Sequence, residues 1–437
     1  MNELIVIVRA TLTWLSQYND LWLVMMPMFF VVEMPLSILV FTGILRWKLS
    51  PPAPPPTHFP GISFVITCYG EGEAIGITID TLVEQHYPGT IEVLAVVDGA
   101  SQNQATYAAA IAGEKRHHKV SNRIVRVIPK WQRGGRVSTL NAGLSKATQP
   151  IVINVDGDTS FDNDMAWQMI STLSQPGVMA SGGALRVRNW DANLLTRMQS
   201  MEYMISMQAG KTGMARWGVL NNISGAFGAF KKTLLQQVGG WDTHTAEDLD
   251  LTMRLKQYKT RYPAAKLAFN PHAVGHTDVP DTLKGLIMQR LRWDGDLLFL
   301  FLRKHRKGLT PRLLGWGNFI FTFIYGVVQN VILPLLVVFF TLFMLYVYPW
   351  VTVVAMLAVL YMMYLVIITL HFVVYITMVS ERPKSDIKMV GWLLLYPLYA
   401  FCMRLITAVS MLNEVLRRSH EESSMAPWWV LRRGKRF

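Results

Sequence analysis

Two carboxylates separated by one glycine follow an apolar run, because Asp156-Gly157-Asp158 comes directly after IVINV at 151–155. In an extended segment residues i and i+2 point the same way, so both carboxylates can converge on one hard cation. A plain turn after a strand would explain the same three residues, but the motifs that follow favour a metal site. We expect Asp156 and Asp158 to bind Mg²⁺ or Mn²⁺, which would take its remaining ligands from a diphosphate and neutralise the leaving phosphates.

A further carboxylate lies one strand–helix unit earlier, where Asp98 ends the apolar run at 91–97. At that position Asp98 could accept hydrogen bonds from a nucleobase or a ribose, or it could cap a helix. Thr67, Tyr69 and Glu71 close the preceding apolar run and offer a hydroxyl, an aromatic face and a carboxylate to the same base. An ordinary loop is the alternative for these three residues.

The segment 130–141, KWQRGGRVSTLN, reads as a basic loop that enters a helix. Gly134 and Gly135 permit close backbone approach, and Arg133 and Arg136 could bind phosphate at the helix N-terminus. A solvated basic loop is the simpler alternative.

An acidic pair, Glu247-Asp248, begins a predicted helix after Gly239-Gly240-Trp241. Carboxylates suit a helix N-terminus electrostatically, which explains the pair without catalysis. The catalytic interpretation makes Asp248 the general base that deprotonates an acceptor hydroxyl during a displacement, with Glu247 beside it.

The segment 282–298, TLKGLIMQRLRWDGDLL, is predicted to be helical, with one apolar stripe. Gln289, Arg292 and Trp293 are spaced i, i+3 and i+4 and therefore share another face, next to Arg290. A Trp can stack on a sugar ring, and an Arg can bind a diphosphate. An amphipathic helix at a membrane surface would show the same residues.

These motifs need a scaffold, and the chain has 437 residues, enough for roughly two structural units. Nearly continuous apolar runs at 62–67, 91–97 and 151–155 predict strands buried on both faces. Helical patterns lie between them, so we expect an α/β domain with a mostly parallel sheet and ligands at the carboxyl ends of its strands.

The composition indicates a membrane protein with one soluble domain, because 51% of residues are hydrophobic, 16% are charged and the mean hydropathy is +0.26. The net charge of +13 fits basic loops beside membrane helices, and it could also attract anionic lipid or substrate. No nucleic-acid motif is present, so we expect no nucleic-acid partner. Cys68 and Cys402 are unlikely to pair, which suits a reducing compartment.

Four apolar segments are long enough to cross a bilayer. The first covers 21–46, is followed by Arg46 and Lys48, and so has that end in the cytoplasm; a shorter stretch at 4–15 is too short to be assigned. The parity of the C-terminal crossings stays open. The remaining three segments are 316–346, 350–379 and 390–412.

Charges inside two of these segments, Glu33 and Arg404, are costly in lipid and could face a channel or a small membrane partner, or lie near an interface. The expected organisation is listed in chain order: membrane segment 1–50, Pro-rich linker 51–60, cytoplasmic α/β domain 61–280, interfacial QRLRW region 281–312, transmembrane helices 313–415 and basic tail 416–437.

Taken in order, these motifs resemble the processive, membrane-embedded family 2 glycosyltransferases, which include cellulose, chitin, hyaluronan and bacterial poly-N-acetylglucosamine synthases. By this resemblance the first Asp binds the uracil side, the DxD binds metal and diphosphate, Asp248 is the base, and QxxRW holds the acceptor end and the diphosphate. The implied fold is GT-A-like. The matching residues are Asp98, Asp156 and Asp158, Glu247 and Asp248, and Gln289, Arg292 and Trp293.

Ser224-Gly225-Ala226 before a helix, the run TDVPDTLKGLIMQRLRW and the compact length favour the poly-N-acetylglucosamine branch, with Ser224 to Ala226 near the acceptor sugar. Some residues depart from the family pattern, and these could change which donor is used and how the acceptor is bound. The core acidic residues are retained. The departures are Gly70, the Gly-Ala-Ser after Asp98, Arg136 in place of a frequent Lys, Ala246 in place of a frequent Thr, and Asp294-Gly295-Asp296 after QRLRW.

The resemblance implies an inverting enzyme of the inner (plasma) membrane that polymerises a UDP-sugar, best UDP-N-acetylglucosamine, onto a growing polysaccharide and exports it through its own helices. A small membrane accessory subunit is a further implied partner. The alternatives are a polymerase of another UDP-sugar, a single-sugar transferase to a lipid carrier, and a polysaccharide receptor or scaffold that has lost catalysis.

Overall fold

A computed structural model describes residues 13, 29–51, 54–242 and 246–418. Several expectations therefore lie partly outside the described residues: the N-terminal segment before residue 29, part of the Pro-rich linker, Thr245 and the basic tail from residue 419.

An eight-stranded sheet, in the order β3-β2-β1-β4-β7-β6-β8-β5, forms the centre of the α/β domain. The three predicted strands are confirmed as β1 (Ile62–Cys68), β2 (Ile91–Asp98) and β4 (Ile151–Asp156), and β3 (Arg123–Lys130) pairs with β2. These four strands are parallel, and Thr67 pairs with Asp156 in the register of β1 and β4. The candidate residues that follow β1, β2 and β4 therefore lie together at the carboxyl ends of these strands.

The other half of the sheet consists of β5 (Ser160–Phe161), β6 (Val178–Val187), β7 (Phe227–Lys231) and β8 (Lys266–Thr277). Strand β6 is parallel to β8, so four of the seven pairings are parallel, and the antiparallel ones involve β5 and β7. The expectation of a helix after Ser224 to Ala226 is wrong, because β7 follows directly. Strand β7 lies between β4 and β6 in the sheet, is buried on both faces, and forms its backbone hydrogen bonds with those two strands.

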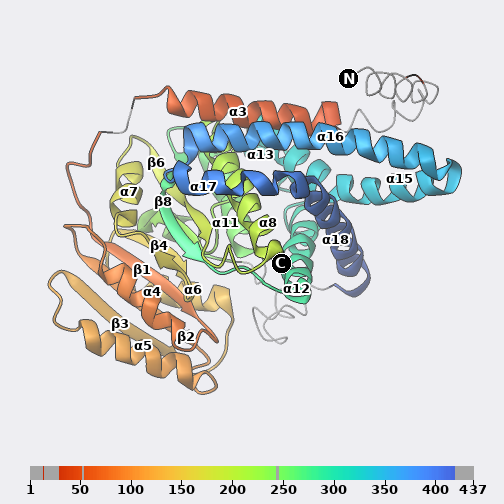
Figure 1. The fold of residues 1–437 in the computed structure, drawn as a ribbon. Helices are drawn as coiled ribbons and strands as arrows, with labels where there is room; N and C mark the ends of the chain where they lie inside the picture. Colours follow the sequence, from red (N-terminus) through yellow and green to blue (C-terminus); the bar gives the residue numbers. More distant parts are fainter. Residues whose placement is uncertain (1–12, 14–28, 52–53, 243–245, 419–437) are drawn as a thin grey trace.

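Helices cover both faces of the sheet, and two apolar clusters fill the space between them (Figure 1). The predicted helices after the basic loop, at the acidic pair and over QRLRW are confirmed as α6, α11 and α12. The helices of this part are α4 (Ala74–Val83), α5 (Gln104–His117), α6 (Arg136–Lys146), α7 (Met165–Leu173), α8 (Leu194–Glu202), η2 (Tyr203–Gly210), α9 (Lys211–Arg216), α10 (Lys232–Gln237), α11 (Glu247–Arg261), α12 (Leu283–Phe299) and η3 (Leu300–Lys304).

Among the described residues, four helical runs are long and apolar enough to cross a membrane: Phe29–Lys48, Trp316–Val347, Trp350–Val379 and Pro383–Arg417. They agree with the four predicted segments. The short helix α13 (Pro311–Leu314) precedes the second run. The elements of the four runs are η1 (Phe29–Glu33), α3 (Met34–Lys48), α14 (Trp316–Phe321), η4 (Thr322–Ile332), α15 (Leu333–Val347), α16 (Trp350–Val374), η5 (Tyr375–Val379), α17 (Pro383–Asp386), η6 (Ile387–Leu395) and α18 (Tyr396–Arg417).

The α/β domain contacts the first membrane helix through two glycines. A Cβ atom on Gly43 of α3 would lie 2.2 Å from the Gly213 carbonyl oxygen, and a Cβ on Gly213 of α9 would lie 2.4 Å from the Val40 carbonyl oxygen. Only glycine permits backbones to approach this closely. Helix α9 is therefore fixed against α3.

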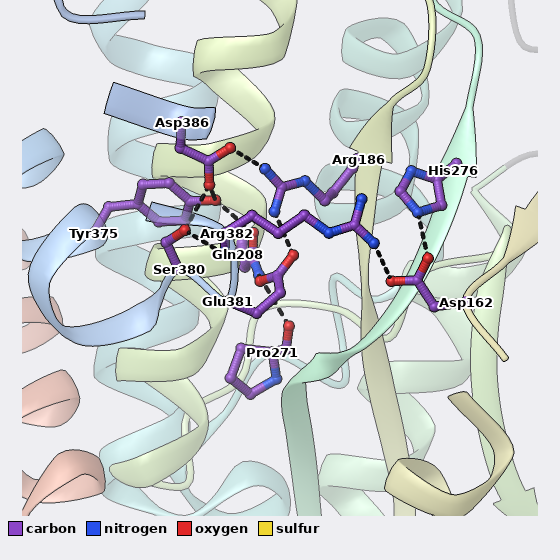
Figure 2. A network of polar contacts seen from close by, with 10 residues as sticks. All are labelled: Asp162, Arg186, Gln208, Pro271, His276, Tyr375, Ser380, Glu381, Arg382 and Asp386. Atoms are coloured by element: carbon purple, nitrogen blue, oxygen red, sulfur yellow. Dashed lines mark hydrogen bonds and ion pairs between the residues drawn. The ribbon is translucent and has the colours of Figure 1, made fainter. Parts of the chain in front are cut away.

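The loop between two membrane helices, 380–386, docks on the α/β domain through a network of buried charges (Figure 2). Arg186 of β6 pairs with Glu381 and Asp386, and Asp386 also contacts the Tyr375 hydroxyl at 2.9 Å. A second connection joins Arg382 to Asp162 at 2.7 Å. The end of the third span therefore lies on the side of the α/β domain.

Replacing Arg186 by Met should destabilise the protein by about 3–5 kcal/mol, because it leaves the Asp386 carboxylate buried without its cation. The thermal midpoint of the full chain in detergent should fall by several degrees. Adding Asp386→Asn, which removes the orphaned charge, should restore part of the loss. Arg382→Met changes an exposed partner in the same network and should have a small effect. Equal effects of Arg186→Met and Arg382→Met would contradict this account of the network.

Candidate active site

All of the candidate residues line one cavity of about 1220 Å³, which extends from the carboxyl ends of β1, β2 and β4 to the membrane helices. Those brought together are Thr67, Tyr69, Glu71, Asp98, Arg136, Asp156, Asp158, Ser224, Gly225, Ala226, Glu247, Asp248, Gln289, Arg290, Arg292 and Trp293. Residues more than 200 positions apart in the sequence thus share one continuous space.

Asp98 is buried at the end of β2 and holds the glycine loop that follows β3. One carboxylate oxygen accepts hydrogen bonds from Lys130 Nζ at 2.6 Å and Gly134 N at 2.9 Å, and the other accepts one from Gly135 N at 2.8 Å. Gly135 has φ +83°, a conformation that favours glycine, directly before α6. Asp98 therefore fixes the backbone conformation of this glycine loop through its hydrogen bonds.

Arg136, the first residue of α6, joins four segments at the centre of the cavity. Its guanidinium lies 2.5 Å from Asp156 Oδ1 and 2.5 Å from Glu247 Oε1. It also donates hydrogen bonds to the Gly225 carbonyl at 2.6 Å and to Thr67 Oγ1 at 3.1 Å. Burial opposes the charge, but the carboxylates of Asp156 and Glu247 outweigh it and raise the pKa of Arg136, so the cation is fixed.

Three carboxyl groups gather near the Asp156-Gly157-Asp158 turn. Burial, together with the charges of Asp158 and Asp156, raises the pKa of Glu71 to about 7. Glu71 Oε2 is buried and has no hydrogen-bond partner among the residues that the structure describes. Burial and the Asp156 charge also raise the pKa of Asp158. This excess of negative charge fits a divalent cation.

Within the described residues no group of three or more His, Cys, Asp or Glu side chains is arranged to hold a metal by itself. Asp156 and Asp158 would therefore supply two ligands and leave the others to a bound diphosphate, as Mg²⁺ sites commonly do.

Asp248 is oriented at the start of α11 by three donors. Asp248 Oδ2 accepts hydrogen bonds from Asn222 Nδ2 at 2.9 Å and Gly225 N at 3.1 Å, and Oδ1 accepts one from Leu249 N at 2.7 Å. A carboxylate has about four acceptor sites, so one remains for a substrate proton. Ala246, directly before the acidic pair, has a positive φ of 48°, which is strained for a residue with a Cβ.

The QRLRW helix, α12, faces the cavity with Gln289, Arg292 and Trp293, as the spacing predicts. Arg290 bonds Glu202 at 2.6 Å and lies 5.1 Å from the centre of the Trp293 ring, so it supports the helix from the domain side. Asp294 is buried and accepts a hydrogen bond from Thr407 of α18 at 2.7 Å, and burial raises its pKa to about 6.

The membrane end of the cavity is polar. Glu33 is buried and contacts both Arg404 and the Tyr364 hydroxyl, and the amide side chains of Gln329 and Asn330 line the same space. The two membrane charges identified in the sequence therefore pair with each other.

Several residues of the cavity carry no signal that the motif search used. Asn222 could have been found, because it precedes Ser224 in the same segment. Glu202 and Lys211 lie on helices of unremarkable sequence, and only the fold brings them to the cavity.

A mixed sheet with an acidic pair at the carboxyl end of a central strand is the arrangement of GT-A glycosyltransferases. The model of the family described as "Glycosyltransferase like family 2" matches residues 60–295, more than half of the chain. The chain therefore belongs to this family.

Poly-beta-1,6-N-acetyl-D-glucosamine synthases are among the similar curated proteins. Those of Staphylococcus epidermidis (strain ATCC 35984) and Staphylococcus aureus (strain COL) are each 31% identical, over 53% and 58% of this chain. The match spans the same shares, little more than half, of those relatives. The mannosyltransferase PcManGT from Pyrobaculum calidifontis, solved with GDP-Man and Mn²⁺, shares the fold, with a TM-score of 0.58 and 18% identity over 88% of this chain and 95% of that one.

Because Arg136 occupies one oxygen of Asp156, removing its charge should strengthen cation binding in the absence of a nucleotide. Arg136→Met should raise Mn²⁺ affinity about tenfold or more, because one unit charge about 5 Å from a divalent ion costs roughly 1.7 kcal/mol even at the dielectric constant of water. Free Mn²⁺ can be titrated by electron paramagnetic resonance with detergent-solubilised protein. Arg116→Met, in an exposed ion pair with Asp80, is the control. Unchanged Mn²⁺ affinity in Arg136→Met would show that the guanidinium does not compete for this site.

Proposed function

We propose that this protein is a processive, inverting glycosyltransferase that polymerises a UDP-sugar, best UDP-N-acetylglucosamine, into an exopolysaccharide and exports it through its own membrane helices. The observation that carries the proposal is the single cavity, which connects the Asp156–Asp158 turn and Asp248 with QRLRW and then with Glu33 and Arg404 in the membrane helices. A transferase that adds one sugar and releases its product has no need of a polar route into the membrane.

The residues fit a single displacement without a covalent intermediate. Asp248, oriented by Asn222 and the Gly225 amide, removes the proton of the acceptor hydroxyl. Arg136 holds positive charge beside the diphosphate position and fixes Glu247. A divalent metal at Asp156 and Asp158 would neutralise the charge that develops on the leaving diphosphate. Trp293 offers a flat apolar face to the acceptor sugar.

The relatives support the choice of sugar and polymer. Both Staphylococcus proteins are named as poly-beta-1,6-N-acetyl-D-glucosamine synthases, and their match covers the segment that holds the candidate site. N-acetylglucosamine is therefore the first donor to test. Hyaluronan-, cellulose- or chitin-like polymerisation would keep the same mechanism with another donor.

We infer that the α/β domain lies in the cytoplasm and that the protein crosses the plasma membrane several times. Arg46 and Lys48 end the first membrane helix on the domain's side, which agrees with the excess of basic residues in cytoplasmic loops. The docked loop at 380–386 lies on that same side. The cytoplasm also supplies the nucleotide sugar.

The deciding experiment uses membranes that contain the protein, with Mg²⁺ or Mn²⁺ and a panel of radiolabelled UDP-sugars, and measures both UDP release and product size. High-molecular-mass product from UDP-N-acetylglucosamine is expected. Polymer from another donor would change the substrate and keep the mechanism. A product with one sugar on each lipid carrier would show that the protein transfers single sugars and does not polymerise them. No turnover with any donor would favour a receptor or scaffold.

Replacing Asp248 by Asn should lower turnover about 10²–10⁴-fold, because the amide cannot accept the proton of the attacking hydroxyl. UDP binding should be retained, since Asn can still accept the hydrogen bonds of Asn222 and Gly225. Turnover is followed as UDP release, with Asp80→Asn, in a surface ion pair, as the control. Near-normal polymerisation by Asp248→Asn would reject the assignment of the base.

The double variant Glu33→Gln with Arg404→Met removes the membrane ion pair without leaving either charge unpaired. Polymer synthesis should persist while transfer of polymer across the membrane falls severalfold, because the polar lining is lost. Inverted vesicles separate the two readouts by enzymatic digestion of polymer outside the vesicle. The exposed Val366→Ala serves as the control. Unchanged export in the double variant would argue against this route.

A further inference from the structure

Lys211 is a buried ammonium group without a partner. The side chain is 5% exposed, lines the cavity, and has no hydrogen-bond or ion-pair partner in the part of the chain that the structure describes. Two other lysines differ: the buried Lys256 contacts Thr322 Oγ1 at 3.3 Å and the Phe321 ring at 5.5 Å, and the half-buried Lys130 bonds Asp98. A buried unpaired charge is costly, so its presence calls for a ligand.

The position of Lys211 is imposed by its helix. Lys211 begins α9, and two residues later Gly213 packs directly on the backbone of α3. A shift of α9 that carried the ammonium to solvent would break this close contact. The preceding segment, η2, is π-helical, a form that occurs frequently at functional sites. The ammonium is therefore held at the cavity wall.

The charge and position of Lys211 suit the part of the cavity that would hold the acceptor. Burial lowers the pKa of Lys211 to about 8, while the Asp248 carboxylate raises it, so the group remains largely cationic near pH 7. Helix α9 packs on Val40 of α3, and Val40 lines the same cavity. Lys211 therefore lies toward the membrane helices, on the side of the cavity that a growing chain would occupy.

An ammonium group has three hydrogen-bond donors and no acceptor, so its ligand must present oxygen atoms. The walls of the cavity around the base already supply Asn222 and Ser224. A sugar ring between these groups would place hydroxyl or acetamido oxygens within reach of a cation while Asp248 takes a proton from its nucleophilic hydroxyl.

We propose that Lys211 binds the acceptor: its ammonium donates hydrogen bonds to hydroxyl or acetamido oxygens of the terminal sugar of the growing chain and holds that sugar against Asp248. The inference rests on the proposed function. It identifies a binding residue outside the family motifs, supplied by the helix that packs on the first membrane span.

The test compares wild type, Lys211→Met, Lys211→Arg and the control Lys259→Met in full-length protein in detergent. Lys259 bonds the Gly218 carbonyl at 3.0 Å and does not line the cavity. Each protein receives UDP-N-acetylglucosamine and increasing concentrations of an N-acetylglucosamine oligosaccharide, and UDP release is also measured without the oligosaccharide.

Lys211→Met should raise the acceptor KM about tenfold, the usual effect of losing hydrogen bonds from a charged donor. The donor KM and acceptor-independent UDP release should stay within about twofold, and Lys211→Arg should keep most of the acceptor affinity. An unchanged acceptor KM, or an equal rise in the donor KM, would overturn the inference.

The two proposals fail in different ways. If the wild-type protein does not elongate any acceptor, the proposed function fails before Lys211 is considered. If the wild type elongates the acceptor and Lys211→Met does so with the same KM, only the role of Lys211 fails. Should Lys211→Met not fold, as judged by its thermal midpoint, Lys211→Gln is measured against the same criteria.

Discussion

The arrangement of the cavity depends on one buried cation. Arg136 binds Asp156 of β4, Glu247 of α11, the Gly225 carbonyl and Thr67 of β1, so four segments meet at a single guanidinium. Each carboxylate would be unfavourable in this space alone, because burial disfavours its charge. The planar fork of an arginine can serve several acceptors at once, whereas the ammonium of a lysine is a compact point charge. The arginine at this position therefore ties the donor side of the cavity to its base.

The same principle applies to other contacts within the α/β domain, within the membrane helices and between the two. Arg186 pairs with Glu381 and Asp386, Arg290 pairs with Glu202, and Glu33 pairs with Arg404. Buried ion pairs contribute little net stability compared with apolar contacts, but they tolerate only one relative position of their partners. The domain is thereby held in register with the helices, and this register is what makes the cavity continuous.

The sequence predicted the parts of the structure that have a local pattern. Dense Val and Ile runs predicted β1, β2 and β4, and long apolar segments predicted the four membrane helices. Strands β6 and β7 were not predicted, because VMASGGALRV and FGAFK are rich in small residues. The network at 380–386 depends on pairs up to 220 residues apart, which no local pattern reveals. Asp98 and Arg136 were identified as site residues, but their partners could be known only from the fold.

The continuity of the cavity has a consequence for how a chain could grow. If the acceptor stays in the cavity after each addition, the next hydroxyl must return to Asp248, so the space between the base and the membrane must be fixed within a fraction of a sugar length. Two features meet this demand: the glycine contact between α9 and α3, and the docking of the 380–386 loop. Neither touches the reacting atoms. Both join the α/β domain to the membrane helices beside the space that the acceptor would occupy, and Lys211, which lines that space, lies on the helix held by the first of them.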